Sequence, residues 1–258
     1  MVGDGVNDGP ALKSAHIGIA MGQKGSEVAK EAADLILVND DLSNLVTAVS
    51  LGRSIHANLK KAIGYIISIH IPIILTVLLP LALNWIYPHI FTPVHVIVLE
   101  LIMGPTCSIV FENEPEQKNL MSNPPLSIQN TLFGKMELLL IVIQGLAITA
   151  GTLLTYQYAI SQGADQLVTR AMVFTSLISS NIVLTLVVRS HYYSLFETLF
   201  YKNYMIPIIL SISVAMLIAF LYVPMFRDFF LFGKLSFEQL LVSVVIGVLS
   251  VIWFEIYK

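Results

Sequence analysis

The sequence predicts a multi-span α-helical membrane protein with six transmembrane helices, preceded by a small α/β segment. Of its 258 residues, 56% are hydrophobic and only 12% are charged, and the mean hydropathy is +0.78. These values are too apolar for a soluble domain of ordinary composition. Long apolar stretches follow a more polar N-terminal segment, so we expect most of the chain to lie in lipid.

Residues 1–50 are predicted to form part of an α/β layer. The short apolar runs 17–21 and 35–38 are typical of buried strands, and residues 26–33 between them are typical of a helix. Two strands and two helices cannot cover both faces of a sheet. We therefore expect this segment to depend on further residues for its stability.

The pattern changes at Asp41, where Asp-Leu-Ser-Asn is typical of a helix N-cap. Apolar residues then recur at near-helical spacing as far as Ile63, with basic residues among them and no strong breaker. We expect a helix that runs through residues 51–61 into a transmembrane domain at 62–258. The alternative is an amphipathic helix that lies on the membrane surface.

Six apolar stretches are each close to the roughly 20 residues that a membrane-spanning helix needs. They cover approximately residues 62–83, 94–111, 136–156, 171–188, 204–223 and 240–256. Loops 84–92 and 161–169 contain no Lys or Arg, and basic residues gather on the opposite side at Lys60, Lys61, Lys118, Lys135, Arg189 and Lys202. Arg227 and Lys234 are exceptions, since they fall on the outer side. Because positive loops mark the cytoplasmic side, both termini are predicted to be cytoplasmic, and we expect a multi-pass protein of the plasma membrane.

The first ten residues contain the only recognisable reaction chemistry. Asp4 and Asp8 are four residues apart, Asn7 stands beside the second, and Gly3 and Gly5 permit close approach of the backbone to a ligand. Mg²⁺ usually takes one or two carboxylates together with phosphate oxygens. The segment therefore indicates either a magnesium and phosphate site or an ordinary Asn/Asp/Gly turn.

The segment G-D-G-V-N-D-G-P from Gly3 to Pro10, with H-I-G-I-A-M-G at 16–22, resembles the hinge segment of P-type cation-transporting ATPases. The pattern from Ile63 to Ile73 resembles the fifth membrane helix of their calcium-type branch. In this family that helix is a stalk, so the resemblance implies a stalk at residues 51–61. The resemblance implies that residues 1–50 are the C-terminal remnant of a haloacid-dehalogenase-like phosphorylation domain. It implies Asp4 as the Mg²⁺ ligand, Asn7 and Asp8 as catalytic positioning groups, and Gly3 and Gly5 as cofactor-binding residues, with ATP as the substrate of the full-length protein.

The D-K-T-G-T motif of the family's phosphorylated aspartate does not occur here. The nucleotide-binding domain, the actuator domain and the first four membrane helices also have no counterpart. The chain therefore resembles the C-terminal portion of a pump that couples aspartyl-phosphate turnover to cation transport. Its expected partners are the transported cation, membrane lipid and the N-terminal part of the same pump.

Polar residues inside the predicted spans are candidate ligands for the transported cation, because ionisable groups are costly at membrane depth. The candidates are Ser68, His70, Glu100, Thr106 and Asn181. Each has a structural alternative, such as an interhelical hydrogen bond for His70 or Asn181. Glu112, Asn113 and Glu114, just beyond the second span, are predicted to be solvated loop residues, and the alternative is that they form a cytoplasmic entry for the ion.

The resemblance does not identify the ion, since His70 and Glu100 stand where the calcium-type branch has Asn. Ca²⁺ takes six to eight oxygen ligands. An imidazole at His70 would tolerate Zn²⁺ or Mn²⁺, or serve as a proton relay.

Charge and cysteine content argue against two other classes of protein, those that bind nucleic acid and those held together by disulfides. The formal net charge of −3 provides no basic footprint, which argues against a nucleic-acid partner. Cys107 is the only cysteine, so an intrachain disulfide is excluded. Two alternatives to a pump remain: a truncated non-catalytic membrane module, which the missing phosphorylation motif favours, and a passive six-span channel or carrier, which the motif from Gly3 to Pro10 argues against.

Overall fold

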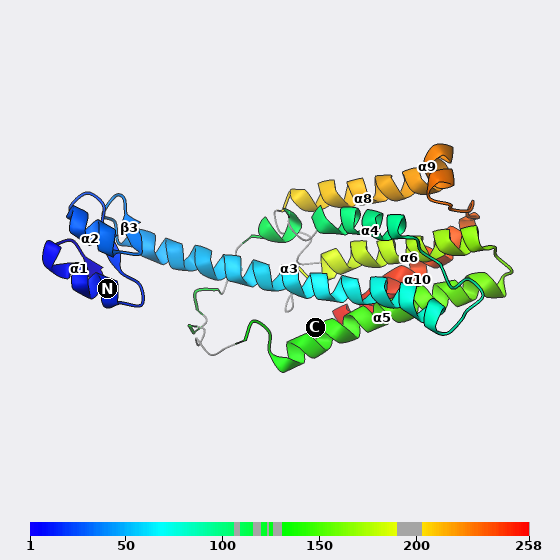
Figure 1. Ribbon diagram of the computed structural model, residues 1–258, viewed down its shortest axis with the longest axis horizontal. Helices are drawn as coiled ribbons and strands as arrows, with labels where there is room; N and C mark the ends of the chain where they lie inside the picture. Colours follow the sequence, from blue (N-terminus) through cyan, green and yellow to red (C-terminus); the bar gives the residue numbers. More distant parts are fainter. Residues whose placement is uncertain (106–108, 116–119, 123, 126–130, 190–202, 258) are drawn as a thin grey trace. The chain divides into compact units, whose positions relative to one another are not determined.

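The computed structural model describes residues 1–105, 109–115, 120–122, 124–125, 131–189 and 203–257 (Figure 1). The chain divides into two compact units. Unit 1 comprises Met1–Ile55 and Glu116–Pro124, and unit 2 comprises His56–Pro115 and Pro125–Lys258. All strands among the described residues lie in unit 1.

Unit 1 is built on a three-stranded parallel sheet in the order β1 (Val2–Gly3), β2 (Ile19–Met21) and β3 (Leu35–Leu37). Helices α1 (Gly9–Ser14) and α2 (Glu27–Ala32) lie in the connections, since parallel strands need crossovers. The strands β2 and β3 and the helix α2 lie inside the ranges that the sequence predicts. Strand β1 was not expected, because two residues carry no periodic pattern.

The core of unit 1 is small. Leu12 from α1, Ala20 from β2 and Ala29 from α2 are completely buried against one another. On β3, by contrast, Leu35 and Ile36 are each 48% exposed. The two short helices cover the sheet only in part. For this reason we expect that additional residues stabilise this unit.

The longest element is α3 (Ser43–Ala82), a helix of 40 residues with residues in both units. Asp41 caps its start, because the Asp41 Oδ1 accepts a hydrogen bond from the Ser43 N–H at 2.9 Å. Tyr65 and Ile69 on α3 are buried in the core of unit 2. This helix therefore contributes to the packing of the apolar unit.

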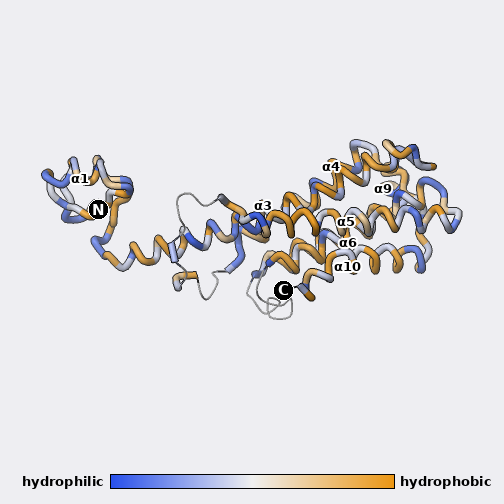
Figure 2. Tube along the Cα trace, turned by 90° about the horizontal axis from the view of Figure 1, so that it is seen from below, coloured by the Kyte–Doolittle hydropathy of each residue, from blue (hydrophilic) through white to orange (hydrophobic). Residues whose placement is uncertain are grey.

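Five of the described helices are long and apolar enough to cross a membrane. Besides α3, they are α5 (Lys135–Ser161), α6 (Gln166–Val187), α8 (Met205–Tyr222) and α10 (Phe237–Tyr257). Figure 2 shows that the helices of unit 2 are predominantly hydrophobic, with hydrophilic residues gathered mainly at their ends and connections. The predicted multi-span helical architecture is confirmed at this level.

The second predicted span, 94–111, corresponds to a shorter helix. Helix α4 (Pro93–Pro105) has 13 residues, and residues 106–108 lie outside those described. A further short helix, α9 (Pro224–Phe229), follows α8. The count of six spans therefore stays a prediction.

Helix α6 is the central helix of unit 2. The most apolar part of α6 is 78% buried, whereas the corresponding part of each of the other four long helices is less than half buried. Helices α5, α6 and α10 lie side by side (Figure 1). Small residues bring α6 and α10 together: Ser180 Oγ donates to the Gly247 carbonyl at 3.1 Å. Close backbone approach of this kind replaces the hydrophobic driving force that lipid does not supply.

Arg170 on α6 holds two connections of unit 2. Its Nε donates to the Ile90 carbonyl at 2.6 Å, and its two Nη atoms donate to the Leu231 and His89 carbonyls at 3.1 and 3.4 Å. The residue is only 4% exposed. The connections that precede α4 and α10 are thus fixed to one buried guanidinium.

Candidate functional site

Asp4 lies directly after β1, at the carboxyl edge of the parallel sheet. Ligand sites of open α/β sheets commonly lie outside this edge. The Asp4 N–H donates to Asp8 Oδ2 at 3.1 Å. Asp4 is exposed, and among the described residues its own carboxylate has no hydrogen-bond or ion-pair partner. This carboxylate is therefore accessible to a ligand.

Asp8 orders the loop that contains Asp4. Its Oδ2 also accepts a hydrogen bond from the Gly5 N–H, at 2.9 Å. A Cβ added at Gly3 would lie 2.7 Å from the Cβ of Asp8, and one added at Gly5 would lie 3.4 Å from Asp8 Oδ2. The Asp8 side chain thus explains the glycine at position 3 without any ligand. Asn7 is exposed in the short 3₁₀ turn η1 (Val6–Asp8).

The donors at this corner fit a magnesium ion that is shared with a phosphate group. Among the described residues, no group of three or more His, Cys, Asp or Glu side chains is arranged to hold a metal ion. A single carboxylate nevertheless suffices for Mg²⁺ when phosphate oxygens and water complete its octahedron. Asp4 would provide that carboxylate, because an oxygen of Asp8 is already engaged by the backbone.

In unit 2, two of the predicted cation ligands lie together. His70 Nε2 on α3 is 3.1 Å from Glu100 Oε1 on α4. Each side chain is 43% exposed, so the described helices do not enclose the pair. The two side chains present an imidazole nitrogen and carboxylate oxygens at one place.

One hydrogen bond orients the imidazole of this pair. His70 Nδ1 is 2.8 Å from the Ile66 carbonyl oxygen, which can only accept, so Nδ1–H is the donor. Nε2 is therefore the ring nitrogen directed toward Glu100 Oε1. A metal ion that binds both side chains would need Nε2 and the carboxylate without protons.

Ser68 and Asn181 are directed elsewhere. Ser68 is 1% exposed, and its Oγ donates to the Ile141 carbonyl on α5 at 3.2 Å. Asn181 Oδ1 accepts a hydrogen bond from the Tyr65 hydroxyl. Both side chains therefore join helices in this structure. Thr106, the remaining predicted ligand, lies outside the described residues.

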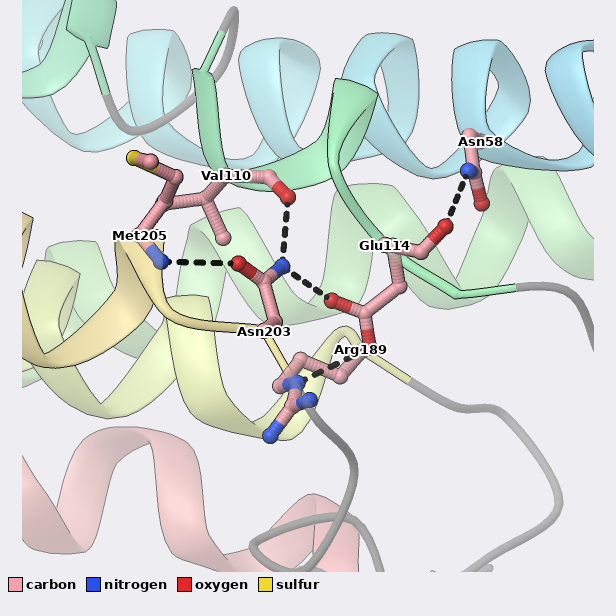
Figure 3. Close-up of polar contacts among 6 residues, drawn as sticks. All are labelled: Asn58, Val110, Glu114, Arg189, Asn203 and Met205. Carbon is pink, nitrogen blue, oxygen red and sulfur yellow. Dashed lines mark hydrogen bonds and ion pairs between the residues drawn. The ribbon is translucent and has the colours of Figure 1, made fainter.

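The prediction of a solvated loop at Glu114 is wrong. Glu114 is 5% exposed, and its Oε1 accepts a hydrogen bond from Arg189 Nε at 2.9 Å (Figure 3). The two residues are separated by 75 positions, so no local pattern reports their pairing. One feature of the sequence points to this pairing. Arg189 directly follows an apolar span, and an arginine at such a position either faces solvent or pairs with a buried carboxylate.

Comparison with known proteins relates the chain to one family. Residues 88–258 match the family described as "Cation transporting ATPase, C-terminus". The chain belongs to the cation-transporting ATPases. This match lies wholly outside the segment from Gly3 to Pro10, so it confirms the resemblance to P-type ATPases from a separate part of the sequence. Together with the five long apolar helices, it shows that this ATPase chain is an integral membrane protein.

Relatives in bacteria, fungi and mammals carry calcium in their names. Calcium-transporting ATPase 1 of Lactococcus lactis is 31% identical over 259 residues, which cover 100% of this chain and 29% of that protein. Calcium-transporting ATPase type 2C member 2 of Rattus norvegicus is 33% identical over 242 residues, covering 93% and 25%. Calcium-transporting ATPase 1 of Yarrowia lipolytica is 31% identical over 253 residues, covering 98% and 27%. The ATPase chain thus spans less than a third of the length of these relatives.

Proposed function

We propose that this chain is the C-terminal portion of an ATP-driven P-type pump that couples aspartyl-phosphate turnover to cation transport. The observation that carries the proposal is the contact between His70 and Glu100, on two apolar helices of a cation-transporting ATPase. An ionisable pair at membrane depth is costly and usually marks an ion pathway. In this proposal the chain crosses the plasma membrane six times, and both of its ends lie on the cytoplasmic side.

The transported ion in this proposal is a divalent cation. The names of the relatives favour Ca²⁺. Because Ca²⁺ takes six to eight oxygens, Glu100 would be one ligand among several, and the exposed side of the pair leaves room for the others. The imidazole of His70 instead favours Zn²⁺ or Mn²⁺, which accept nitrogen ligands more readily than Ca²⁺ does.

The proposed role of Asp4 is to hold Mg²⁺ beside the phosphoryl group, in a haloacid-dehalogenase-like phosphorylation domain. A Mg²⁺ ion held by Asp4 would supply positive charge against the negative charge that develops on the phosphoryl group during in-line transfer. Asp8 keeps the loop in shape through the Asp4 and Gly5 N–H groups, and Asn7 is exposed beside them. Helix α3 has residues in both units, which supports coupling through the stalk at 51–61.

The membrane half of the proposal is tested in the complete pump, reconstituted in lipid vesicles. We expect ATP-dependent accumulation of Ca²⁺, measured beside Mn²⁺ and Zn²⁺, and an ion-dependent phosphoenzyme. Glu100→Gln keeps the side-chain size and removes the charge, so the ion concentration for half-maximal ATP hydrolysis should rise at least about tenfold, since a lost charged ligand costs more than 1.4 kcal/mol. The matched control is Glu112→Gln at an exposed position, which should leave that concentration unchanged.

The phosphoryl half is tested with Asp4→Ala, which should abolish phosphoenzyme formation and turnover in the same preparation. Turnover near the wild-type rate would remove Asp4 from the magnesium site. Unchanged ion dependence in Glu100→Gln would remove the His70–Glu100 pair from the ion pathway. ATP-independent flux through the vesicles would favour a passive channel or carrier instead.

A further inference from the structure

Glu114 is the centre of a buried polar cluster that joins three parts of unit 2 (Figure 3). Its Oε1 accepts from Arg189, just beyond α6, at 2.9 Å, and its Oε2 accepts from the Asn203 side-chain amide, just before α8, at 2.8 Å. Its backbone carbonyl accepts from the Asn58 amide on α3 at 2.9 Å. The side chains of Glu114 and Arg189 are each only 2% exposed. The pair is therefore well shielded from water.

A second cation lies close to this cluster. Lys61 follows Asn58 by three positions on α3, which places both on one face of the helix. Lys61 is 4% exposed, yet among the described residues its ammonium has no hydrogen-bond or ion-pair partner. Glu114 and Arg189 are the charged groups that act on it electrostatically. One buried carboxylate thus has two buried cations near it, and only one of them is paired.

We propose that Lys61 is a second ion-pair partner of Glu114, so that the carboxylate can exchange Arg189 for Lys61. An unpaired buried cation is costly, and a bond to Glu114 would replace that cost with a charge-assisted hydrogen bond. The flexible stem of lysine lets the ammonium move while the helix backbone stays in place.

The exchange changes which helix the carboxylate holds. In the present arrangement, Glu114 is tied through its side chain to the residues after α6 and before α8. In the second arrangement, the same carboxylate is tied to α3, while its carbonyl still accepts from Asn58. Two discrete pairings of one buried group form a two-state element between α3 and the later helices. This inference concerns unit 2 itself and does not rest on the proposed pump activity.

The test is a double-mutant cycle on the purified chain in detergent micelles, with the unfolding equilibrium measured for each variant. Lys61→Met and Arg189→Met each remove one charge at similar side-chain length. Because each single variant leaves Glu114 one cation, both should fold, and Lys61→Met should change stability little. The double variant leaves Glu114 buried without a cation. The factor by which it raises the unfolding equilibrium constant should therefore be at least tenfold larger than the product of the factors for the two single variants. A double variant that cannot fold while both singles fold is the same result in stronger form.

Lys60→Met is the matched control, because Lys60 is the adjacent lysine but pairs with Glu137 at 2.7 Å. Combined with Arg189→Met, it should produce no excess effect, whereas Lys61→Arg in the Arg189→Met background should preserve stability because the charge is kept. Three results would overturn the proposal. They are independent effects of Lys61→Met and Arg189→Met, equal coupling for Lys60 and Lys61, or failure of Arg189→Met alone to fold.

Discussion

The contact between α6 and α10 makes Gly247→Ala the most direct test of how this membrane unit is held together. A Cβ added at Gly247 would lie 2.6 Å from the Ser176 carbonyl oxygen, 2.9 Å from Ser179 Cβ and 3.2 Å from Ser180 N. Two of these three atoms belong to the backbone of α6. They cannot rotate away, so the helices must separate to admit a single methyl group.

The magnitude follows from overpacking and from one hydrogen bond. Inserting a methyl group into a tightly packed contact costs about 1–3 kcal/mol. Separation of the helices also weakens the 3.1 Å bond from Ser180 Oγ to the Gly247 carbonyl, and such bonds average about 0.6 kcal/mol in membranes. The preference of a helix for alanine over glycine, about 0.5–1 kcal/mol, offsets part of this cost, so we expect a net loss of about 1–3 kcal/mol. For a domain of this size, that corresponds to a fall in Tm of roughly 2–12 °C.

Thermal unfolding of the purified chain in detergent, followed by far-ultraviolet circular dichroism, measures this change. The matched control is Gly52→Ala on α3, where an added Cβ would meet nothing within 4 Å. There, alanine should leave Tm unchanged or raise it slightly, because it is favoured over glycine inside a helix by about 0.5–1 kcal/mol. Equal Tm values for Gly247→Ala and the wild type would refute the close helix contact.

Two further predictions concern polar contacts. Arg170→Met should destabilise the chain by about 2–5 kcal/mol. The buried Ile90 carbonyl loses its donor at about 1–3 kcal/mol, and the two part-buried bonds to the Leu231 and His89 carbonyls are lost at about 0.5–1.5 kcal/mol each. Arg170→Lys should lie between this variant and the wild type, and a shift in Tm below 2 °C for Arg170→Met would contradict this role. In unit 1, hydrogen bonds from the Gln23 and Lys24 N–H groups, at 2.9 Å each, help to lower the pKa of Asp40 below its ordinary value of 3.8. Because the pKa of Asp40 is lower in the folded state, these bonds stabilise the loop fully at pH values above 3.8. Their contribution is lost as the pH falls through the folded-state pKa. The amide NMR signals of Gln23 and Lys24 should therefore titrate together below pH 3.8, and Asp40→Asn should abolish the titration; signals that stay constant in the wild type would exclude the linkage.

Local composition was sufficient to predict most elements. Transfer of a helix into lipid depends mainly on the summed hydropathy of about 20 consecutive residues, so the long spans are visible in the sequence alone. Helix α2 and strands β2 and β3 are likewise marked by short contiguous patterns. The family resemblance at Gly3 to Pro10 also lies in contiguous residues, and the match at 88–258 agrees with it.

The choice of partners was decided only by tertiary structure. Polarity singled out His70, Glu100, Ser68 and Asn181 alike, yet the fold joins the first two and directs the others to neighbouring helices. The direction of a polar side chain depends on which helix packs beside it.

Glu114 shows the same limit most clearly. Its sequence neighbours are polar, which predicts a solvated loop, whereas the fold buries it against Arg189, 75 positions away. The free energy of a buried charge depends on partners that folding brings together from distant positions, and no window of neighbouring residues contains them. The sequence by itself therefore determined the membrane helices and the family, and the packing of those helices decided which charges are paired.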